Sequence, residues 1–176
     1  MVLAPDERIF IGLGSNLSGP HGDPQAQLEA ALVELAAAGV RTVRRSRWYE
    51  SEPVPVADQP WFVNGVVEVE TALDPAELLA LLHRVEAAFG RIRRVRNEAR
   101  ALDLDLLAYG DRVLAGEAGP ILPHPRLQDR AFVLLPLAEI APSWRHPLLG
   151  ESAAVLAEKL PPGQRIRLAG PAVEAE

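Results

Sequence analysis

One short stretch, Arg100 to Leu107, constrains this chain more than any other. It reads Arg-Ala-Leu-Asp-Leu-Asp-Leu-Leu, an apolar run that carries acids at Asp103 and Asp105. Successive side chains of an extended strand point to opposite faces, so the two carboxylates share one face while leucines fill the other. The pattern therefore predicts a strand buried on one side, with two acids whose Cα atoms lie about 6.5 Å apart on the other.

Two carboxylates at this spacing can bind one hard cation or a pair of cations, and oxygen ligands suit Mg²⁺. Without a cation the two carboxylates would repel each other. The simpler explanation is a solvent-facing strand whose polar face happens to carry two acids. An isolated Asp-x-Asp pattern favours that simpler explanation, so the neighbouring sequence has to decide.

The preceding segment, from Arg84 to Arg100, favours metal binding. It contains six arginines and two glutamates, a net charge of +4, although the whole chain carries −6. Guanidinium groups bind phosphate oxygens bidentately, and Mg²⁺ links phosphates to the carboxylates that hold it. A positive segment that leads into an acid pair therefore indicates a polyphosphate substrate together with Mg²⁺.

The composition indicates an ordinary globular protein. Of 176 residues, 48% are hydrophobic and 24% are charged, and we expect residues 1–170 to form one domain and residues 171–176 to be a frayed tail. The absence of cysteine excludes disulfides and thiolate nucleophiles. The sequence has no membrane-length apolar run and no leader pattern, which predicts a cytoplasmic protein without membrane contact. The acidic balance argues against a nucleic-acid partner, and no obligate protein partner is indicated.

The order of the expected elements predicts the fold class. Apolar periodicity, capping residues and breaks indicate strands at 8–13, 40–49, 61–70, 100–107 and 164–168, and helices at 24–38, 74–89, 130–140 and 152–160. We expect Gly14 to break the first strand, a hairpin at 109–111 to return the acid-bearing strand, and Pro136 to lie near the start of its helix. The order is not doubly wound. It fits an α+β domain of ferredoxin-like kind, with a mainly antiparallel sheet covered by helices.

Three polar residues have two interpretations each. Asn64 is an amide among apolar residues, and it either pairs with backbone at a strand end or recognises a ring. Glu86 lies in the last turn of a helix, where an acid opposes the helix dipole; a solvated helix flank is the commoner explanation, and a role in a site is the alternative. His124 lies between two prolines, where it is either structural or a phosphate contact.

Several motifs, each weak alone, resemble one known family when their order and spacing are taken together. They are Gly14-Ser15-Asn16, Asp58-Gln59-Pro60 followed by Phe62-x-Asn64, Glu86-x-x-x-Gly90-Arg91-x-Arg93, Arg100-x-Leu-Asp103-Leu-Asp105, Pro123-His124-Pro125 and Arg130-x-Phe132. From about residue 9 to 142 the chain resembles the 6-hydroxymethyl-7,8-dihydropterin pyrophosphokinase family. One departure stands at residues 97–100, where Asn-Glu-Ala-Arg replaces the Trp-Gly-Pro-Arg that members often carry.

The resemblance implies a reaction and a set of site residues. The hydroxymethyl oxygen of the pterin would attack the β-phosphorus of ATP, and AMP would leave without any protein nucleophile. Two Mg²⁺ ions would be held by Asp103 and Asp105, and loops 51–60 and 91–100 would close over the substrates. The implied pterin contacts are Ser51, Val54, Phe62, Asn64 and Phe132; the implied catalytic arginines are Arg91, Arg93 and Arg100; the implied ATP contacts are Glu86, Arg93, Arg100, His124 and Arg130.

Two other functions compete with this interpretation. Asp-x-Asp with Mg²⁺ also serves nucleotidyltransferases, but the net charge of −6 and the paired phenylalanines argue against a nucleic-acid enzyme. A non-catalytic ferredoxin-like module that binds a ligand is the second alternative. Such a module would have no need of an arginine-rich segment beside two acids that can bind metal.

Overall fold

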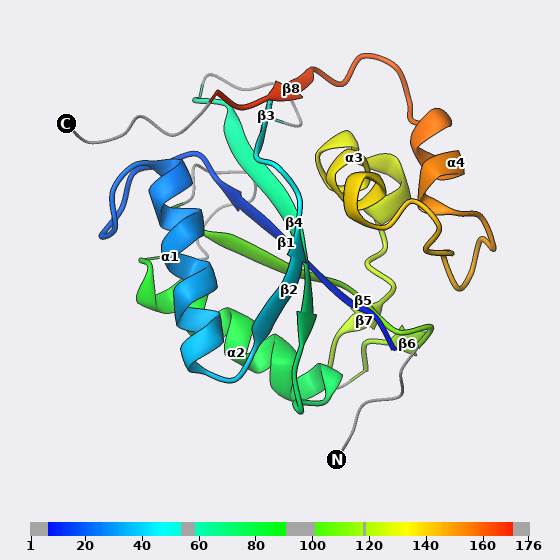
Figure 1. Ribbon diagram of the computed structural model, residues 1–176, viewed down its shortest axis with the longest axis horizontal. Coiled ribbons are helices and arrows are strands. Elements are labelled where there is room, and N and C mark those ends of the chain that lie inside the picture. The colour runs from blue at the N-terminus through cyan, green and yellow to red at the C-terminus, as the bar shows by residue number, and fades with distance from the viewer. Residues whose placement is uncertain (1–6, 54–58, 91–100, 118, 171–176) are drawn as a thin grey trace.

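The strand that carries the two acids lies at the edge of the main sheet, beside the first strand of the chain. The computed structural model describes residues 7–53, 59–90, 101–117 and 119–170. The helices and strands within these ranges are β1 Ile9–Ser15, α1 Pro24–Ala37, β2 Arg41–Arg45, β3 Tyr49–Ser51, β4 Phe62–Glu70, α2 Pro75–Ala88, β5 Asp103–Tyr109, β6 Leu114–Ala115, β7 Ile121–Leu122, the 3-10 turn Leu127–Asp129, α3 Ala131–Ile140, α4 Ala153–Glu158 and β8 Ile166–Leu168. Figure 1 shows their arrangement.

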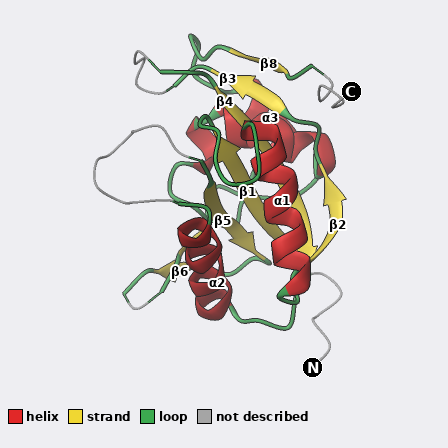
Figure 2. Cartoon of the chain, turned by 90° about the vertical axis from the view of Figure 1, so that its left-hand side faces the viewer, coloured by secondary structure: helices red, strands yellow, loops and turns green. Residues whose placement is uncertain are grey.

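The main sheet is antiparallel at every pairing that the described residues make. Its strands follow the order β5-β1-β4-β3-β8, and β2 pairs with β4 beside β3. Helices cover both faces, with α1 and α2 on one side and α3 and α4 on the other (Figures 1 and 2). This confirms the predicted α+β architecture with a mainly antiparallel sheet covered by helices.

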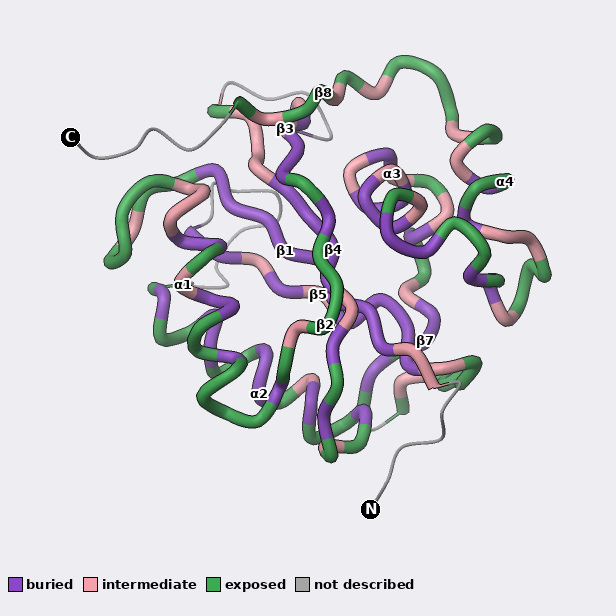
Figure 3. Tube along the Cα trace, viewed as in Figure 1, coloured by how far each residue is buried: buried purple, intermediate pink, exposed green. Residues whose placement is uncertain are grey.

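Alternation along β1 separates two hydrophobic cores. Ile9, Ile11 and Leu13 pack in one core with residues of α1 and α2. Phe10 points to the opposite face and packs with residues of α3 and α4. Every residue of β1 is buried, as the purple trace in Figure 3 shows, because helices lie on both sides of it. The strand β1 is therefore the centre of the molecule.

The start of α2 follows its sequence signals. The Asp74 carboxylate accepts the N–H of Glu77 at 2.8 Å, and the Glu77 carboxylate accepts the N–H of Asp74 at 3.4 Å. Pro75, which has no N–H to lose, takes the first helical position. The expected capping box is confirmed, and it fixes where the helix leading to Glu86 begins.

The single strand predicted at 40–49 is wrong. The structure has two shorter strands, β2 and β3, separated by residues 46–48. At the break the Ser46 hydroxyl accepts the N–H of Val66 at 3.0 Å, in place of a backbone carbonyl. The Trp48 ring lies against Gly65, where a Cβ would be 2.5 Å from the ring. A side-chain hydrogen bond and a large ring thus interrupt the ladder, and periodicity does not reveal either.

Three further boundaries differ from the prediction. Gly14 does not end β1, which continues to Ser15 because strands on both sides bond to it. The segment that follows the turn at 109–111 does not pair with β5 as a hairpin would. Instead, β6 pairs with β7, and the N–H of Gly110 donates to the carbonyl of Arg8 at 2.7 Å. Pro136 lies in the middle of α3, not near its start.

The contact between Gly65 and Trp48 gives a test of the fold. We expect Gly65→Ala to lower the free energy of unfolding by about 1–3 kcal/mol, because the new methyl group overlaps the indole ring and the buried ring has little room to move. Urea unfolding followed by tryptophan fluorescence measures the loss. Gly170→Ala is the control, since nothing lies within 4 Å of its Cβ position. Equal midpoints for the two variants would contradict the packing described.

Candidate active site

A cavity of about 660 Å³ lies on the face of the sheet that α3 covers. That volume is in the range of pockets that bind small metabolites. The residues around it come from β1, β3, β4, β5, the turn before α3 and α3 itself. They include Gly12, Gly14, Ser51, Glu52, Phe62, Asn64, Asp103, Asp105, Arg126, Arg130 and Phe132. Segments far apart in the sequence therefore form one site.

The floor of the cavity depends on a glycine. Gly14 lies opposite Asn64 on one neighbouring strand and opposite Asp103 on the other. A Cβ on Gly14 would lie only 2.9 Å from the Oδ1 atom of Asn64. The absence of a side chain there leaves space between the amide and the carboxylate. The interpretation of Gly14 as a plain structural turn missed this role, because only the strand pairing reveals it.

Asn64 belongs to the cavity and is held by a neighbouring side chain. Its Nδ2 group donates a hydrogen bond of 2.5 Å to the Ser51 hydroxyl, and both residues are buried. Ser51 lies on β3 and Asn64 on β4, so adjacent strands set the geometry of the pair. This bond fixes the plane of the amide and therefore what its carbonyl oxygen faces.

The two acids share one face of β5, as alternation predicted. Asp103 and Asp105 are half-buried and line the cavity, while Leu104 and Leu106 are buried in the core on the other side. Asp103 pairs with Gly14 and Asp105 with Gly12, so each carboxylate stands beside a glycine. No side chain of the directly paired residue on β1 therefore stands beside either acid.

Glu86 is not on a solvated helix flank, and that interpretation is wrong. Its side chain is 1% exposed, and its Oε2 atom accepts the N–H of Leu104 at 2.9 Å. Leu104 separates the two acids, and its N–H points to the open edge of β5, where the described chain supplies no strand partner. The carboxylate of α2 thus satisfies a backbone donor of an edge strand. It contacts the backbone of the acid pair but does not line the cavity.

His124 lies next to the cavity wall. Its Nδ1 atom accepts the N–H of Arg126 at 3.2 Å, so the neutral ring carries its proton on Nε2. Burial and the nearby positive charge of Arg130 lower the pKa of His124, and Asp103 opposes them. Because the folded-state pKa lies below the ordinary value of 6.5, the unfolded chain binds the proton more readily than the folded one. Protonation of this histidine therefore lowers the free energy of unfolding as the pH falls below 6.5.

The two predicted aromatic rings both line the cavity. Phe62 is the first residue of β4, and Phe132 lies in the first turn of α3. The guanidinium of Arg130 lies 5.4 Å from the centre of the Phe132 ring, a cation–π distance. The cavity therefore has one ring and a cation on the side of α3, the second ring on β4, and carboxylates on β5.

The structure brings together most of the predicted site. Among the described residues, Ser51, Phe62, Asn64, Asp103, Asp105, Arg130 and Phe132 line the cavity, whereas Glu86 and His124 stand beside it. Val54, Arg91, Arg93 and Arg100 lie outside the described residues, as do parts of both expected loop closures, and predictions about them stay predictions.

Asn16 is a residue whose role the sequence did not reveal. It is buried, and its Nδ2 group donates to the Gln59 side chain and to the Pro60 carbonyl, both at 3.0 Å. These bonds hold the chain just before Phe62 against the end of β1. The motif Gly14-Ser15-Asn16 contained the signal, but the partners lie more than 40 residues away.

None of the helices formed by the described residues is long and apolar enough to cross a membrane.

Comparison with known proteins gives a consistent result. The family model described as 7,8-dihydro-6-hydroxymethylpterin-pyrophosphokinase (HPPK) matches residues 10–142. A 2-amino-4-hydroxy-6-hydroxymethyldihydropteridine pyrophosphokinase from Synechocystis sp. is 45% identical over 151 residues, which are 85% of this chain and 74% of that protein. The protein of the same name from Pseudomonas aeruginosa is 43% identical over 143 residues, 80% of this chain and 85% of that protein.

Larger proteins also match. The folic acid synthesis protein fol1 of Pneumocystis carinii is 37% identical over 155 residues, 88% of this chain but only 20% of that protein. The crystal structure of wild-type HPPK-DHPS from Plasmodium falciparum with SDX-DHP has a TM-score of 0.65 at 15% identity, and the match covers 87% of this chain and 43% of that one. At this identity the likeness supports the fold alone. The chain spans less than half of these longer proteins.

The surroundings of His124 yield a prediction. We expect Arg130→Ala to raise the pKa of His124 towards its ordinary value, because it removes a positive charge that disfavours the protonated ring. An NMR titration of the histidine ring protons measures this. His146 is the internal control, since burial alone lowers its pKa, which should not change. An unchanged His124 titration would show that the two groups are not close.

Proposed function

The chain belongs to the 7,8-dihydro-6-hydroxymethylpterin-pyrophosphokinase family, and from this membership we infer that it transfers pyrophosphate from ATP to the hydroxymethyl group of 6-hydroxymethyl-7,8-dihydropterin. It is an ATP-dependent pyrophosphokinase of folate synthesis, and its substrates are small molecules. The observation that carries the proposal is the joining, in one cavity, of two stacking rings, an oriented amide and two carboxylates.

We propose that the pterin binds between Phe62 and Phe132. A flat heterocycle gains stacking energy from aromatic neighbours, and buried hydrogen bonds at its edge give specificity. Asn64, oriented by Ser51, would form hydrogen bonds with the polar edge of the pterin. Val54 would add a backbone contact. A ring system that cannot complete these bonds would leave the buried amide unsatisfied, which disfavours other flat compounds.

Asp103 and Asp105 would hold Mg²⁺, and we propose two ions. The donor set fits, since both groups are half-buried carboxylates on one face beside an open floor. Within the described ranges no group of three or more metal-binding side chains occurs. Mg²⁺ commonly has only one or two carboxylates as protein ligands and takes phosphate oxygens and water for the rest. When bound, Mg²⁺ would neutralise part of the negative charge of the triphosphate.

In the proposed reaction the hydroxymethyl oxygen of the pterin forms a bond to the β-phosphorus of ATP. The bond between that phosphorus and the oxygen bridging to the α-phosphate breaks, AMP leaves, and the hydroxyl proton passes to solvent or to a phosphate oxygen. No protein group becomes covalently attached. The protein therefore contributes by positioning the two substrates and by offsetting negative charge.

Positively charged residues would bind the triphosphate. Arg130 reaches the cavity from the start of α3, and His124 would donate from Nε2 beside it. We propose Arg91, Arg93 and Arg100 as further phosphate contacts and as the catalytic arginines, on the strength of the family motif. Glu86 would act at the ATP site through the backbone of Leu104, whose N–H it accepts.

The competing functions are less well supported. A nucleotidyltransferase or a binding module would not account for the family match over residues 10–142. We propose that residues 1–170 form a single pyrophosphokinase domain. The longer relatives, such as HPPK-DHPS, carry further sequence beyond the part that matches this chain.

The first test is AMP release from ATP and Mg²⁺, with and without 6-hydroxymethyl-7,8-dihydropterin. We expect release that depends on the pterin and matches the yield of pterin pyrophosphate.

Asp105→Asn should lower kcat by about a thousandfold, because an amide cannot replace a carboxylate that holds the metal. Asp111→Asn, at an exposed turn, is the matched control and should have normal activity. Normal turnover by Asp105→Asn would contradict the assignment of Asp105 as a Mg²⁺ ligand.

Phe132→Ala tests the stacking position. Loss of one face of the ring site should weaken pterin binding by about tenfold, since one aromatic contact contributes roughly 1–1.5 kcal/mol beyond area burial. ATP binding should be largely retained. Calorimetric titration with each ligand separately makes the comparison. An equal loss of both affinities would argue that the variant disturbs the whole site.

A further inference from the structure

The end of the described chain contacts both walls of the active-site cavity. This C-terminal segment, residues 161–169, lies beyond the residues that the family model matches. Its strand β8 pairs with β3, and Ile166 lies opposite Ser51. Two further backbone bonds extend the pairing: the N–H of Glu52 donates to the Arg165 carbonyl at 3.0 Å, and that of Ala169 to the Trp48 carbonyl at 2.9 Å. Figure 1 shows β8 beside β3.

The same segment bonds to the start of α3. The Gln164 Oε1 atom accepts the N–H of Ala131 at 2.8 Å, and its Nε2 group donates to the Asp129 carbonyl at 2.9 Å. These two backbone groups flank Arg130, which occupies the cap position and makes no capping bond with its own side chain. Gln164 therefore supplies from a distant part of the chain what a capping side chain usually supplies locally.

Phe132 follows directly in the first helical turn. Helix N-terminal N–H groups have no partner within the helix, and a first turn without a cap frays. The direction of the Phe132 side chain is thus only as well defined as the turn that carries it. The bonds from Gln164 fix that turn relative to β8, and β8 is fixed to the strand that carries Ser51.

Packing alone does not fix this spacing. A smaller hollow of about 230 Å³ lies between the two walls, lined by Ser51, Pro53, Phe132, Pro162 and Gln164 among others. An unfilled space transmits little force, since atoms on its walls lack contacts across it. The C-terminal segment bridges this hollow, since β8 pairs with β3 in one wall and the Gln164 side chain bonds to the start of α3 in the other.

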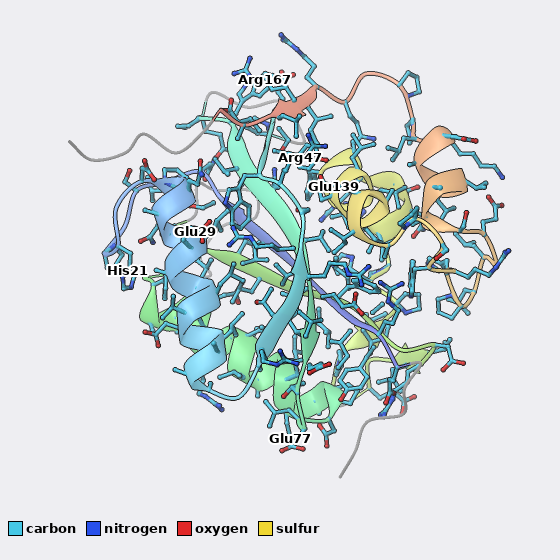
Figure 4. All side chains as sticks on the ribbon, in the orientation of Figure 1. His21, Glu29, Arg47, Glu77, Glu139 and Arg167 are labelled. Carbon is cyan, nitrogen blue, oxygen red and sulfur yellow. The ribbon has the colours of Figure 1, made fainter. Side chains whose placement is uncertain are left out.

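The segment also contacts the residue that precedes the other ring of the site, Phe62. The guanidinium groups of Arg165 and Arg167 lie 5.4 and 4.7 Å from the ring centre of Trp61, the residue before Phe62. Arg167 also forms an ion pair of 2.9 Å with Glu50 on β3. Figure 4 shows Arg167 at the β8 edge of the molecule. Such exposed pairs contribute little singly, but here they keep β8 in register with the strands next to it.

The opposite end of α3 has its own attachment. Glu139 accepts the Tyr49 hydroxyl with one carboxylate oxygen and the N–H of Arg47 with the other, at 3.0 Å for the latter. Figure 4 shows Arg47 and Glu139 side by side. The C-terminal half of α3 is therefore bound directly to the chain around β3, whereas its N-terminal turn reaches β3 through Gln164.

We propose that Gln164 is a positioning residue of the pyrophosphokinase reaction: it holds Phe132 at the distance from Ser51 and Asn64 that the pterin requires. The proposal rests on the proposed function, since it assigns the two walls to the pterin. The C-terminal segment belongs to the substrate site even though it lies outside the part of the chain that the family model matches.

The test is Gln164→Ala, read out in two ways. The N–H of Ala131 should exchange with solvent faster, because its acceptor is gone. The KM for the pterin should rise by about fivefold, the factor that corresponds to one lost hydrogen bond, while kcat changes much less. Gln164→Glu should restore the KM in part, because its carboxylate can still accept the N–H of Ala131 at a helix N-terminus that favours negative charge but cannot donate to the Asp129 carbonyl.

Ser152→Ala is the matched control. It removes the N-cap of α4, a bond of 3.2 Å to the N–H of Val155, from the same C-terminal part of the chain. It should lower stability by a comparable amount and leave the pterin KM unchanged. The same rise in KM for both variants would overturn the proposal, as would faster exchange at Ala131 with an unchanged KM. A wild-type protein that releases no AMP would overturn the proposed function instead, so the two failures are distinguishable.

Discussion

The backbone pairing of β1 with β4 on one side and β5 on the other is the constraint on which the rest of this structure depends. One register places Gly14 between Asn64 and Asp103, and the same register sends Ile9, Ile11 and Leu13 into the core under α1 and α2. A slip of one residue would move every side chain to the opposite face. The core and the site are therefore specified by one set of hydrogen bonds.

The helix α3 supplies the second wall of the cavity, opposite the sheet. The sheet supplies one wall of the cavity, with an amide, two acids and glycines. The helix adds a second wall that carries Phe132 and Arg130, held at one end by Glu139 and at the other by Gln164. The cavity is thus a gap between two elements whose separation is set by attachments outside it.

Local patterns in the sequence were sufficient for part of this arrangement. The shared face of Asp103 and Asp105 follows from strand alternation alone, and the start of α2 follows from its capping residues. The order of the motifs indicated the family and most of the residues around the cavity. The wrong strand predictions arose where a side chain or another strand took over a backbone bond, as Ser46 does for Val66.

Contacts between distant segments could not be predicted in this way. For Glu86 a solvated helix flank is the commoner interpretation, because an acid at a helix C-terminus has no local partner, yet its partner is the N–H of Leu104 on an edge strand. Gln164 has no recognisable motif, because its function depends only on the place where β8 joins β3. In both residues a polar side chain satisfies a backbone group of another element.

The position of Glu86 also bears on the electrostatics of the site. Three carboxylates lie around Leu104 of β5: Glu86 accepts its N–H at the open edge of the strand, and Asp103 and Asp105, its neighbours in sequence, line the cavity. Carboxylates repel an anionic ligand, so a site that contains them binds phosphate only where positive charge offsets them. Arg130 supplies some of that charge, and the sequence between residues 84 and 100, at +4, leads directly into the strand. We therefore expect the excess of arginine there to offset these acids when the triphosphate of ATP binds.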